Sequence, residues 1–308
     1  MSKKLSIIII SYNTKESILK SIRSIYASFP DDLFEIVVVD NNSVDGSPEE
    51  IRKRFPEVSL IVNPVNRGFA AGCNQGLKIS QGEYLLLLNP DTLIDQSLLK
   101  MVEYMKDNKK VGVLGCKVLN PDGSIQRTAY APPSLLNDII SSLTFKWLWL
   151  LRPKNRWVAR QCRISQKPFE VGWISGACLL TRRETIQDIG LLDEKFFLGA
   201  EDVDWCYRAQ NKGWKVVYFP QARVIHIGGQ STKKELALKI ESHYQKRIHF
   251  AQKYYGKTAL RLIRRISLTE LLIKEVIIRL KPKIDEAEKR AKLKGYRQAL
   301  KILSGKSK

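Results

Sequence analysis

The residues from Tyr84 to Leu88 form an uninterrupted apolar run that ends in the polar sequence Asn89-Pro90-Asp91. A strand with one wet face alternates apolar and polar residues, so this run predicts a central strand that is covered on both faces. Because Pro90 has no N–H for a sheet ladder, we expect pairing to stop there and to leave Asp91 unpaired at the rim. An ordinary turn before a helix is the alternative. Open α/β sheets bind ligands at the carboxyl ends of their strands, which makes Asp91 a candidate site residue.

Strand-like and helix-like segments alternate through the first 118 residues. This rhythm predicts an α/β fold in which helices flank a mostly parallel central sheet. The expected strands there are 5–11, 35–40, 58–62, 84–88 and 111–118, and the expected helices are 15–27, 48–55, 69–79 and 97–106. The pattern breaks at 135–163, which we interpret as an insertion. It resumes with a strand at 171–181, helices from 183 and at 202–212, and strand segments at 215–219 and 224–226.

The last quarter of the chain is strongly basic. Residues 233–308 contain 22 Lys and Arg against 7 Asp and Glu, so +15 of the net charge of +21 lies there. Between 260 and 280 the basic residues interleave with large aliphatic ones at helical spacing, which predicts an amphipathic helix. Such an extension suits an anionic membrane surface, with packing onto the rest of the chain as the alternative. A nucleic-acid-binding protein is the rival class, but the tail has few aromatic residues for base stacking.

Cysteine usage and hydropathy indicate the redox compartment of the protein and whether it crosses a membrane. The five cysteines form no Cys-x-x-Cys pair and only three histidines accompany them, so neither a zinc site nor a disulfide framework is predicted. A reducing cytoplasm fits this usage. The apolar stretch 5–10 is too short for a signal sequence, and no apolar run approaches the ~20 residues that cross a bilayer.

Further candidate residues follow other predicted elements. Asp40 ends the strand at 35–40, where a carboxylate can accept hydrogen bonds from a nucleobase or a ribose. Arg67 precedes the helix at 69–79 and can face an anionic group. The glycines near it, at 68, 72 and 76, are four apart and suit close helix packing. They are not a Gly-x-Gly-x-x-Gly motif, which argues against a Rossmann dehydrogenase or nucleotidyltransferase.

Acidic residues and a histidine stand out downstream. Glu201, Asp202 and Asp204 open a predicted helix, where they act either as caps or, because clustered carboxylates raise one another's pKa, as a general base. His226 lies on an apolar strand segment and is either a core residue or a metal ligand. With Asp40 and Asp91, these residues predict a nucleotide site, a divalent-cation site and a carboxylate base.

In their order along the chain, these motifs resemble the inverting family 2 glycosyltransferases of GT-A fold. The resemblance covers about residues 5–232, and five motifs carry it: 6–13, 38–43, 66–69, 89–91 and 201–205. It implies a GT-A catalytic domain at 1–232, with nucleotide-sugar binding at 1–118 and the acceptor side at 119–232, followed by a helical basic extension at 233–308. It also implies a nucleotide-diphospho-sugar donor, Mg²⁺ or Mn²⁺, and transfer by single displacement with inversion.

The same resemblance assigns residues at the donor and metal sites. Asp40 matches the acid that binds the base, and Asp91 matches the last acid of the Asp-x-Asp signature. Asn89 departs from the pattern, because an acid usually stands there, and His226 becomes the implied second metal ligand beside Asp91. The implied nucleotide-sugar-binding residues are Ser11, Tyr12, Asn13, Asp40, Asn42, Asn66, Arg67, Gly68, Asn89, Pro90 and Asp91.

For catalysis, Asp202 matches the acid that deprotonates the acceptor hydroxyl, with Glu201 as the alternative. The implied acceptor-binding residues are Trp173, Ser175, Gly176 and Trp205. The motifs look most like the rhamnosyltransferase branch, which implies a dTDP-linked deoxysugar; a UDP- or GDP-sugar is the alternative.

The acceptor is then expected to be a glycan or a polyprenyl-diphosphate-linked glycan in cell-surface polysaccharide synthesis. We expect a cytoplasmic enzyme that is peripheral on the inner face of the membrane. The aromatic and basic segment 145–152 and the C-terminal helices would supply the contact. A homodimer through the C-terminal helices is an alternative role for the extension, and no nucleic-acid partner is expected.

Overall fold

The computed structural model describes the chain except for residues 1–3, 31, 142–152, 229–235, 281–284 and 305–308. The chain divides into two compact units. The first comprises Met1–Pro132, Lys154–Glu194 and Glu201–Gln230, and the second comprises Pro133–Pro153, Lys195–Ala200 and Ser231–Lys308. The second unit thus takes in two internal segments besides the predicted C-terminal extension.

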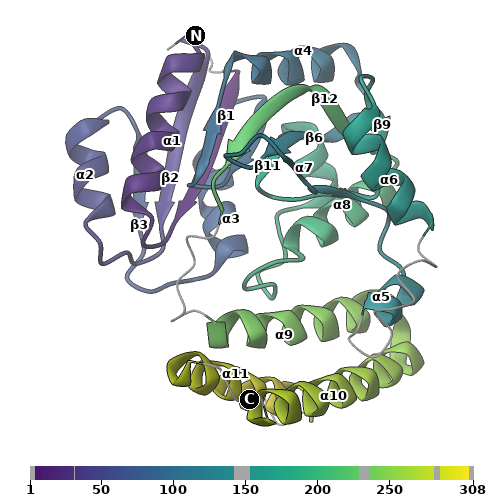
Figure 1. Cartoon of the computed structure of the whole chain (residues 1–308). Coiled ribbons are helices and arrows are strands. Elements are labelled where there is room, and N and C mark those ends of the chain that lie inside the picture. Colours follow the sequence, from purple (N-terminus) through teal and green to yellow (C-terminus); the bar gives the residue numbers. More distant parts are fainter. Residues whose placement is uncertain (1–3, 31, 142–152, 229–235, 281–284, 305–308) are drawn as a thin grey trace. The chain divides into compact units, whose positions relative to one another are not determined.

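The first unit contains all the described strands and most of the shorter helices (Figure 1). Its strands are β1 (Leu5–Ser11), β2 (Phe34–Asp40), β3 (Ser59–Val62), β4 (Tyr84–Leu88), β5 (Thr92–Ile94), β6 (Val111–Leu119), β7 (Ile125–Gln126), β8 (Ala129–Tyr130), β9 (Phe169–Glu170), β10 (Trp173–Ile174), β11 (Cys178–Arg182) and β12 (Lys215–His226). Its helices are α1 (Lys15–Ser28), α2 (Ser47–Arg54), α3 (Phe69–Ile79), α4 (Leu99–Asp107), α6 (Pro153–Ile164), α7 (Arg183–Ile189) and α8 (Glu201–Asn211).

Ten strands form one mixed sheet. Eight follow the order β3-β2-β1-β4-β11-β6-β12-β5, with β7 paired to β6 and β9 to β12. β1 is parallel to β2 and β4, β2 to β3, and β6 to β12, whereas β11 and β5 run antiparallel to their neighbours. Six of the ten strands, β1, β2, β3, β4, β6 and β12, therefore run in the same direction, in agreement with the predicted mostly parallel sheet. Residues of α1, α2 and α4 pack on one face, and residues of α3, α6, α7 and α8 pack on the other.

Strand β4 is buried along its whole length, as its composition predicts. Tyr84, Leu86 and Leu88 belong to one hydrophobic core, while Leu85 and Leu87 belong to the other. Successive side chains of a strand point to opposite faces, so a strand between two cores needs apolar residues at every position. This requirement explains the absence of polar residues from 84 to 88.

Glycines in α3 allow that helix to lie close to β1. A Cβ atom on Gly72 would lie 3.0 Å from Ile10 Cγ2, and one on Gly76 would lie 2.5 Å from Ile8 Cγ2. The distance at Gly76 is shorter than real side chains show, and that at Gly72 is tighter than most, so the spacing of four places bare backbone against the sheet. The packing interpretation is confirmed for Gly72 and Gly76, whereas Gly68 precedes the helix with a φ of +85°.

The chain beyond Pro90 differs from the prediction. Pairing does not end at Asp91, because Thr92–Ile94 forms β5 and pairs antiparallel with the end of β12. The β4 ladder stops before Pro90. The chain then continues to β5, which lies at the end of the strand order next to β12. The expectation of an unpaired Asp91 segment was wrong, because β12 supplies a partner from a distant part of the sequence.

Two other strand predictions also change. Residues 171–181 form two strands, β10 and β11, and β10 pairs with β8 in a separate two-stranded sheet. The intervening Gly176 donates its N–H to the side chain of Asp202, so no strand ladder can continue through it. By contrast, β12 is continuous from Lys215 to His226, and its pairing shifts register between Phe219 and Arg223. Pro220 lies at this irregularity, where its missing N–H breaks no ladder hydrogen bond.

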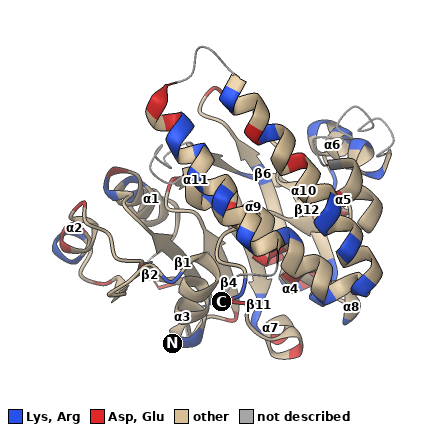
Figure 2. Cartoon of the chain, turned by 90° about the horizontal axis from the view of Figure 1, so that it is seen from below, with Lys and Arg blue, Asp and Glu red and all other residues tan. Residues whose placement is uncertain are grey.

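The second unit is helical, as predicted for the extension. It contains α5 (Leu135–Ser141), α9 (Leu236–Tyr254), α10 (Gly256–Leu280) and α11 (Glu286–Leu303). The three long helices lie side by side (Figures 1 and 2) and share a core. Buried members of this core are Tyr244, Ile248, Ala251, Ile263, Leu271, Ile278, Tyr296, Ala299 and Leu303.

Candidate active site

Polar residues end or directly follow three neighbouring strands at the carboxyl end of the sheet: Ser11 ends β1, Asp40 ends β2, and Asn89 follows β4. Ser11 of β1 pairs with Asp40 of β2, and Ile9 of β1 pairs with Leu88 of β4. The ends of β2 and β4 are therefore two strand spacings apart, about 10 Å. The structure thus gathers the predicted donor-site residues along the carboxyl ends of β2, β1 and β4.

Asp40 has one carboxylate oxygen that is satisfied and one that is not. The residue is fully buried, and its Oδ1 accepts a hydrogen bond from Ser43 N at 2.8 Å. Its Oδ2 has no hydrogen-bond partner within the described residues. A buried acceptor without a donor costs about 1–3 kcal/mol, more when it is charged. This oxygen therefore suits a ligand that brings an N–H or O–H group, such as a base imide or a ribose hydroxyl.

The loops that follow β1 and β2 are joined through Asn13. Its Oδ1 accepts a hydrogen bond from Val44 N at 2.9 Å, and its N–H donates to Ser43 Oγ at 2.8 Å. Asn13 and Asn42 have φ angles of +52° and +69°, which asparagine tolerates better than most residues. The loops thus form one connected wall of the site. Of the other predicted residues here, Tyr12 and Asn42 are exposed and Ser11 is buried.

The segment from Asn66 to Gly68 is tied to the end of β2. Asn66 Oδ1 accepts a hydrogen bond from Gly68 N at 2.9 Å, and Gly68 O accepts one from Asn41 Nδ2 at 3.0 Å. Gly68 has a φ of +85°, in the left-handed region that favours glycine. Arg67, between these two anchored residues, is exposed and accessible to an anionic group.

Asp91 and His226 lie side by side although they are far apart in the sequence. The antiparallel pairing of β5 with the end of β12 brings them together. Ile227 N donates to Asp91 O at 2.9 Å, and Gly228 N donates to Asp91 Oδ2 at 3.1 Å. The Nε2 atom of His226 lies 3.1 Å from Asp91 Oδ1 and 3.2 Å from Asn89 Nδ2. Three predicted residues thus meet at one point.

Gln126 determines which nitrogen of His226 carries a proton. Its Nε2 group donates to Asn120 Oδ1 at 2.6 Å and to His226 O at 2.8 Å, so both of its N–H groups face oxygens. Its Oε1 therefore faces His226 Nδ1, at 2.9 Å. An amide oxygen can only accept, so Nδ1 must be the donor. In the neutral ring, Nε2 then holds the lone pair on the side of Asp91 and Asn89.

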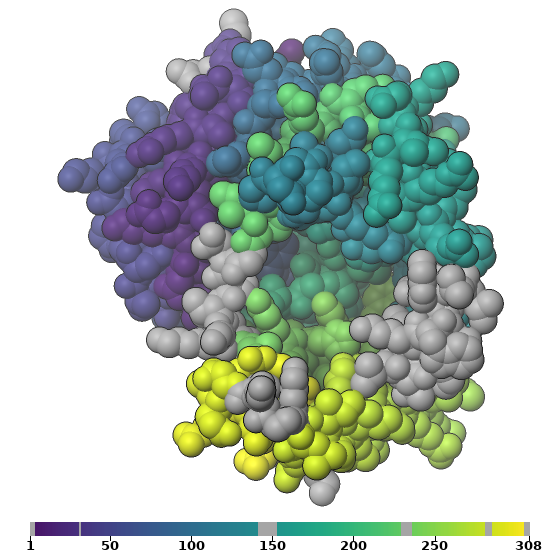
Figure 3. Space-filling model, viewed as in Figure 1, coloured from purple at the N-terminus to yellow at the C-terminus, as the bar shows by residue number. Residues whose placement is uncertain are grey.

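Figure 3 shows green residues of the β12 region at the surface between the purple N-terminal segments and blue segments that precede residue 150. Gln126 connects the blue and the green segments. It lies on β7, which pairs with β6, and its side chain forms hydrogen bonds with His226 on β12. The end of β12 is therefore held from two sides, by β5 and by β7.

The donor set formed by Asp91 and His226 fits a divalent cation. When the imidazole is neutral, Nε2 and Asp91 Oδ1 both present lone pairs at 3.1 Å, an arrangement that a shared cation stabilises. Carboxylate oxygen and imidazole nitrogen are both common ligands of Mn²⁺, and metal-binding histidines commonly donate their other N–H to a carbonyl group, as here. Within the described ranges, no three His, Cys, Asp or Glu side chains are placed to hold a metal ion together. Asp91 and His226 could therefore supply two ligands, and the phosphates of a substrate others.

The three acids at the start of α8 have different surroundings. Asp204 is fully buried and pairs with Arg208 Nε at 2.8 Å, so it serves the structure of the helix. Glu201 is also buried. Asp202 is only half-buried, and its Oδ2 accepts a hydrogen bond from Gly176 N at 3.0 Å. Because a general base must reach its substrate, Asp202 is better placed than Glu201 for that role.

Gly176 also connects Asp202 with the segment that precedes α3. A Cβ atom on Gly176 would lie 3.5 Å from Phe69 Cε1 and 4.0 Å from Asp202 Oδ2. The loop of Ser175 and Gly176 therefore lies between the candidate base and the ring of Phe69. Phe69, which ends the predicted donor-side motif, and Asp202 therefore both lie next to Gly176.

Aromatic rings line the predicted acceptor side. Trp173 stacks on Tyr130 with ring centroids 4.0 Å apart and planes 8° from parallel, and Arg127 Cζ lies 4.4 Å from the Tyr130 ring centre. Burial raises the pKa of the Tyr130 hydroxyl, and the charge of Asp202 acts in the same direction. The half-buried Trp173 is thus part of a stacked pair near Asp202.

Trp205 does not take the predicted position. It is fully buried among residues of the core beneath α8, and its indole N–H donates to Gly190 O at 2.9 Å. No ring face is left for an acceptor sugar, so this burial argues against the expected acceptor contact. The acidic residues before Trp205 correctly predicted the start of α8, but the position of Trp205 around the helix places its side chain in the core.

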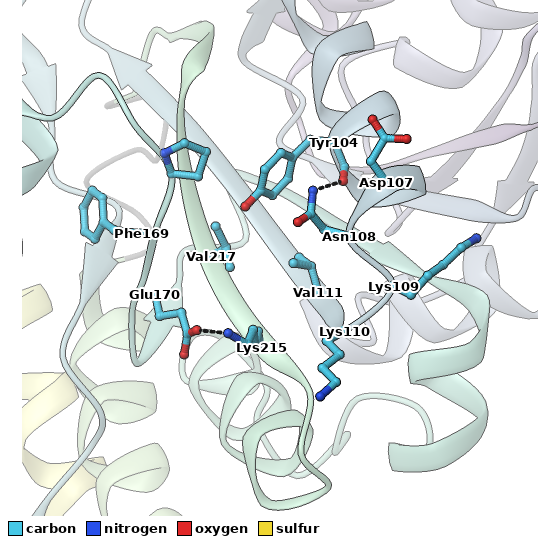
Figure 4. Close-up of a pocket in the computed structure, with 11 residues that line it drawn as sticks. Tyr104, Asp107, Asn108, Lys109, Lys110, Val111, Phe169, Glu170, Lys215 and Val217 are labelled. Carbon is cyan, nitrogen blue, oxygen red and sulfur yellow. Dashed lines mark hydrogen bonds and ion pairs between the residues drawn. The ribbon is translucent and has the colours of Figure 1, made fainter.

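A cavity of about 530 Å³ lies at the opposite edge of the sheet (Figure 4). Its lining includes Val111 and Lys215, the first residues of β6 and β12, and Lys215 pairs with Glu170. Parallel sheets bind their ligands at the carboxyl ends of strands, and this cavity lies at the amino ends. It contains none of the predicted site residues.

Two residues of the site were missed by the sequence reasoning. Gln126 and Tyr130 lie on two-residue strands, β7 and β8, in a stretch that has no clear period. The turn at 120–123 was the only local signal of a hairpin there. Their partners, His226 and Trp173, are distant in sequence, so nothing local marks either residue as part of a site.

The glycosyl transferase family 2 model matches residues 6–190 of the chain. Among curated proteins, an N-acetylglucosaminyl-diphospho-decaprenol L-rhamnosyltransferase of Mycobacterium tuberculosis is 30% identical over 224 residues, which cover 68% of this chain and 72% of that protein. The dTDP-rhamnosyl transferase RfbF of Shigella flexneri is 22% identical over 286 residues, which cover 91% of this chain and 87% of that protein.

Solved structures show the same fold at low identity. A mannosyltransferase from Pyrobaculum calidifontis, in complex with GDP-Man and Mn²⁺, aligns with a TM-score of 0.57 at 16% identity and covers all of this chain and 89% of its own. GalNAc-T7 with UDP, GalNAc and Mn²⁺ aligns with a TM-score of 0.56 at 18% identity; this chain spans about half of that protein, 54%. These likenesses confirm the predicted fold.

Proposed function

Because this chain belongs to glycosyl transferase family 2 and has the GT-A fold, we propose that it transfers L-rhamnose from dTDP-rhamnose to a hydroxyl group of a lipid-linked glycan. The observation that carries this proposal is the meeting of Asn89, Asp91 and His226 beyond the end of β4, together with the unsatisfied oxygen of Asp40 at the end of β2. A nucleoside diphosphate needs a polar anchor for its base and a separate site for its phosphates. The relatives named L-rhamnosyltransferase and dTDP-rhamnosyl transferase support the choice of sugar.

The donor would lie along the strand ends. Asp40 Oδ2 accepts a hydrogen bond from the base or the ribose, and the loops of Asn13 and Asn42 close around that end. Arg67 lies in the anchored turn before α3, from which a guanidinium group can neutralise part of the phosphate charge. Among the remaining predicted donor residues, Ser11, Tyr12 and Pro90 lie at the ends of β1 and β4, and Asn66 and Gly68 lie in the segment before α3 that is tied to the end of β2.

Asp91 Oδ1 and His226 Nε2 would hold the cation, Mn²⁺ or Mg²⁺. A bound divalent cation stabilises the negative charge that develops on a diphosphate leaving group. Gln126 keeps the lone pair of His226 on Nε2, so the ring is ready to bind without changing its tautomer. Asn89 brings no charge to this site, which leaves Asp91 as its one described acid.

Asp202 would act as the general base in a single displacement. Its carboxylate takes the proton of the acceptor hydroxyl while the acceptor oxygen forms a bond to the anomeric carbon. The bond from that carbon to the diphosphate oxygen breaks, and its electrons leave with the nucleotide. Attack from the side opposite the leaving group inverts the anomeric centre. The hydrogen bond from Gly176 N orients Asp202 for this role.

The acceptor would approach from the side of Trp173 and Tyr130, past Ser175 and Gly176. Stacked aromatic rings offer an apolar surface to a sugar ring, and the main chain at Gly176 leaves room beside Asp202. A glycan carried on a polyprenyl diphosphate places the work of this enzyme at the cytoplasmic face of a membrane, in the synthesis of a cell-surface polysaccharide. None of the helices in the described ranges is both long and apolar enough to cross a bilayer.

The test is the replacement Asp202→Asn, measured with dTDP-rhamnose, Mn²⁺ and a lipid-linked acceptor. We expect transfer to fall by about 10²–10⁴-fold, the range for loss of a general base, while donor affinity changes little. Glu201→Gln is the matched control and should retain transfer, since Glu201 is buried. Unchanged turnover in Asp202→Asn would refute the base assignment. Faster transfer from a UDP- or GDP-sugar would refute the proposed donor.

A further inference from the structure

One face of α10 remains apolar after the helix has packed into its own unit. The inward side of the helix includes Ala259, Ile263, Leu271 and Ile278, which are buried. An amphipathic helix that packs by one face normally presents polar residues on the other. In the second half of α10, the exposed residues include Thr269 and Arg279, but most are large and aliphatic, with exposed fractions from 39% to 75%: Leu268, Leu272, Ile273, Val276, Ile277 and Leu280.

The outward face changes character along the helix. Arg261 and Arg265 are exposed in the first half, and Leu268, Leu272 and Val276 continue the same row at steps of three or four residues. Residues at this spacing lie on one side of an α-helix. The 25 residues of α10 span about 37 Å, so the basic half and the apolar half form one long surface. We call this row of five residues the α10 face.

Acidic residues do not offset the positive charge of the α10 face. The acids of α10 are Glu270 and Glu275, and each is paired within the unit. Glu270 contacts Arg247 at 3.1 Å and Lys274 at 2.6 Å, and Glu275 contacts Arg279 at 2.5 Å. Figure 2 shows the blue basic segments along the three long helices. The charge of Arg261 and Arg265 is thus available to a partner.

We propose that the α10 face is a docking surface for an anionic lipid bilayer. A helix with aliphatic side chains on one stretch and arginines on the next can bury the first in the interfacial region while the second contacts anionic head groups. A second copy of this chain would present the same positive charges, and like charges oppose that pairing. Charge complementarity therefore favours anionic lipid as the occupant.

The docking proposal rests on the proposed function in one respect, because the α10 face would bring the enzyme to a lipid-linked acceptor. Membrane binding by itself needs neither sugar donor nor acceptor. A binding experiment without substrates therefore reports on the surface alone, and transfer to a water-soluble acceptor reports on the enzyme alone. Failure of one proposal can be told from failure of the other.

The experiment is co-flotation of the full chain with vesicles of phosphatidylcholine alone or with 30% phosphatidylglycerol, at low and at high salt. We expect flotation only with the anionic vesicles, reduced by salt. Arg261→Ser and Arg265→Ser should each weaken binding by about fivefold, from the attraction per basic residue at an anionic surface. Leu272→Ser combined with Val276→Ser should weaken it at least about tenfold.

Matched controls lie in the first unit. Ile79→Ser removes an aliphatic side chain that is 47% exposed on α3, and Arg52→Ser removes an exposed arginine of α2. Both controls should float like the wild type, and every variant should keep its melting temperature. The proposal is overturned if the wild type does not float with anionic vesicles, or if the double aliphatic variant floats equally well. It is also overturned if light scattering finds a dimer that this double variant dissociates.

Discussion

Replacing Gln126 by leucine should weaken the binding of the cation, although the cation does not contact Gln126 itself. The leucine cannot accept the hydrogen bond that His226 Nδ1 now donates over 2.9 Å, so the ring is free to adopt the other tautomer. That tautomer places a proton on Nε2, toward Asp91. Loss of such an outer partner typically lowers metal affinity by about 10–100-fold, or about 1.4–2.8 kcal/mol.

The variant Gln126→Glu separates two effects that Gln126→Leu combines. These are the loss of the acceptor for His226 Nδ1 and the loss of the two hydrogen bonds that Gln126 donates. A carboxylate still accepts from Nδ1 of His226, but it cannot donate to Asn120 Oδ1 or to His226 O, as Gln126 does at 2.6 and 2.8 Å. Both variants lose these two hydrogen bonds, worth about 0.5–1.5 kcal/mol each. We therefore expect both to lose stability, whereas only Gln126→Leu loses most of its cation affinity.

The assay is titration of Mn²⁺ in the presence of dTDP, followed by electron paramagnetic resonance or calorimetry. Nitrogen-15 spectra of the three histidines provide a readout that does not depend on metal or activity. They should show His226 protonated at Nδ1 in the wild type and a mixture in Gln126→Leu. The reasoning fails if Gln126→Leu binds Mn²⁺ as tightly as the wild type while His226→Ala does not. It also fails if the wild-type proton resides on Nε2.

Three further outcomes follow from the packing. Trp205→Phe should cost about 1–3 kcal/mol of unfolding free energy, because Gly190 O loses its shorter hydrogen bond and keeps only the one from Arg208 at 3.5 Å. The KM for the acceptor should not change, and a raised KM would support contact between Trp205 and the acceptor. Gly76→Ala should destabilise the protein by about 1–3 kcal/mol in urea unfolding, since its Cβ would lie 2.5 Å from Ile8, and an unchanged midpoint would contradict close packing of α3. All five cysteines are buried and free, and burial raises the pKa of Cys162 to about 11 and of Cys206 to about 12. Raising the pH from 8 to 10 should therefore leave native thiols slow toward Ellman's reagent, although it speeds the reaction of the urea-unfolded chain; fast native labelling at pH 8 would refute their burial.

Much of the sheet could be predicted because its strands carry local signals. The run at 84–88 has apolar residues at every position, and the structure places it between two cores. The helices at 15–28, 69–79 and 201–211 likewise begin and end within a residue or so of the predicted bounds. Hydrophobic period and end signals involve neighbours in the chain, so they can be read without knowing the fold.

Short strands escaped prediction for the opposite reason. β5, β7, β8 and β10 have two or three residues each, too few to show a period. β5, β8 and β10 exist because a distant segment offers backbone partners, as β12 does for β5, whereas β7 pairs across a local turn with the end of β6. Two features of the candidate site depend on such strands: the approach of His226 to Asp91 and the contact of Gln126 with His226.

Motifs and local hydrophobic patterns were enough to identify the family, the α/β architecture and the residue types at the site. How those residues are used depends on the folded arrangement. It paired β5 with β12, so that Asp91 faces His226, and it turned Trp205 into the core while leaving Asp202 beside Gly176. The physical reason is that side-chain direction and strand pairing are set by contacts between segments far apart in the chain, which no local pattern encodes.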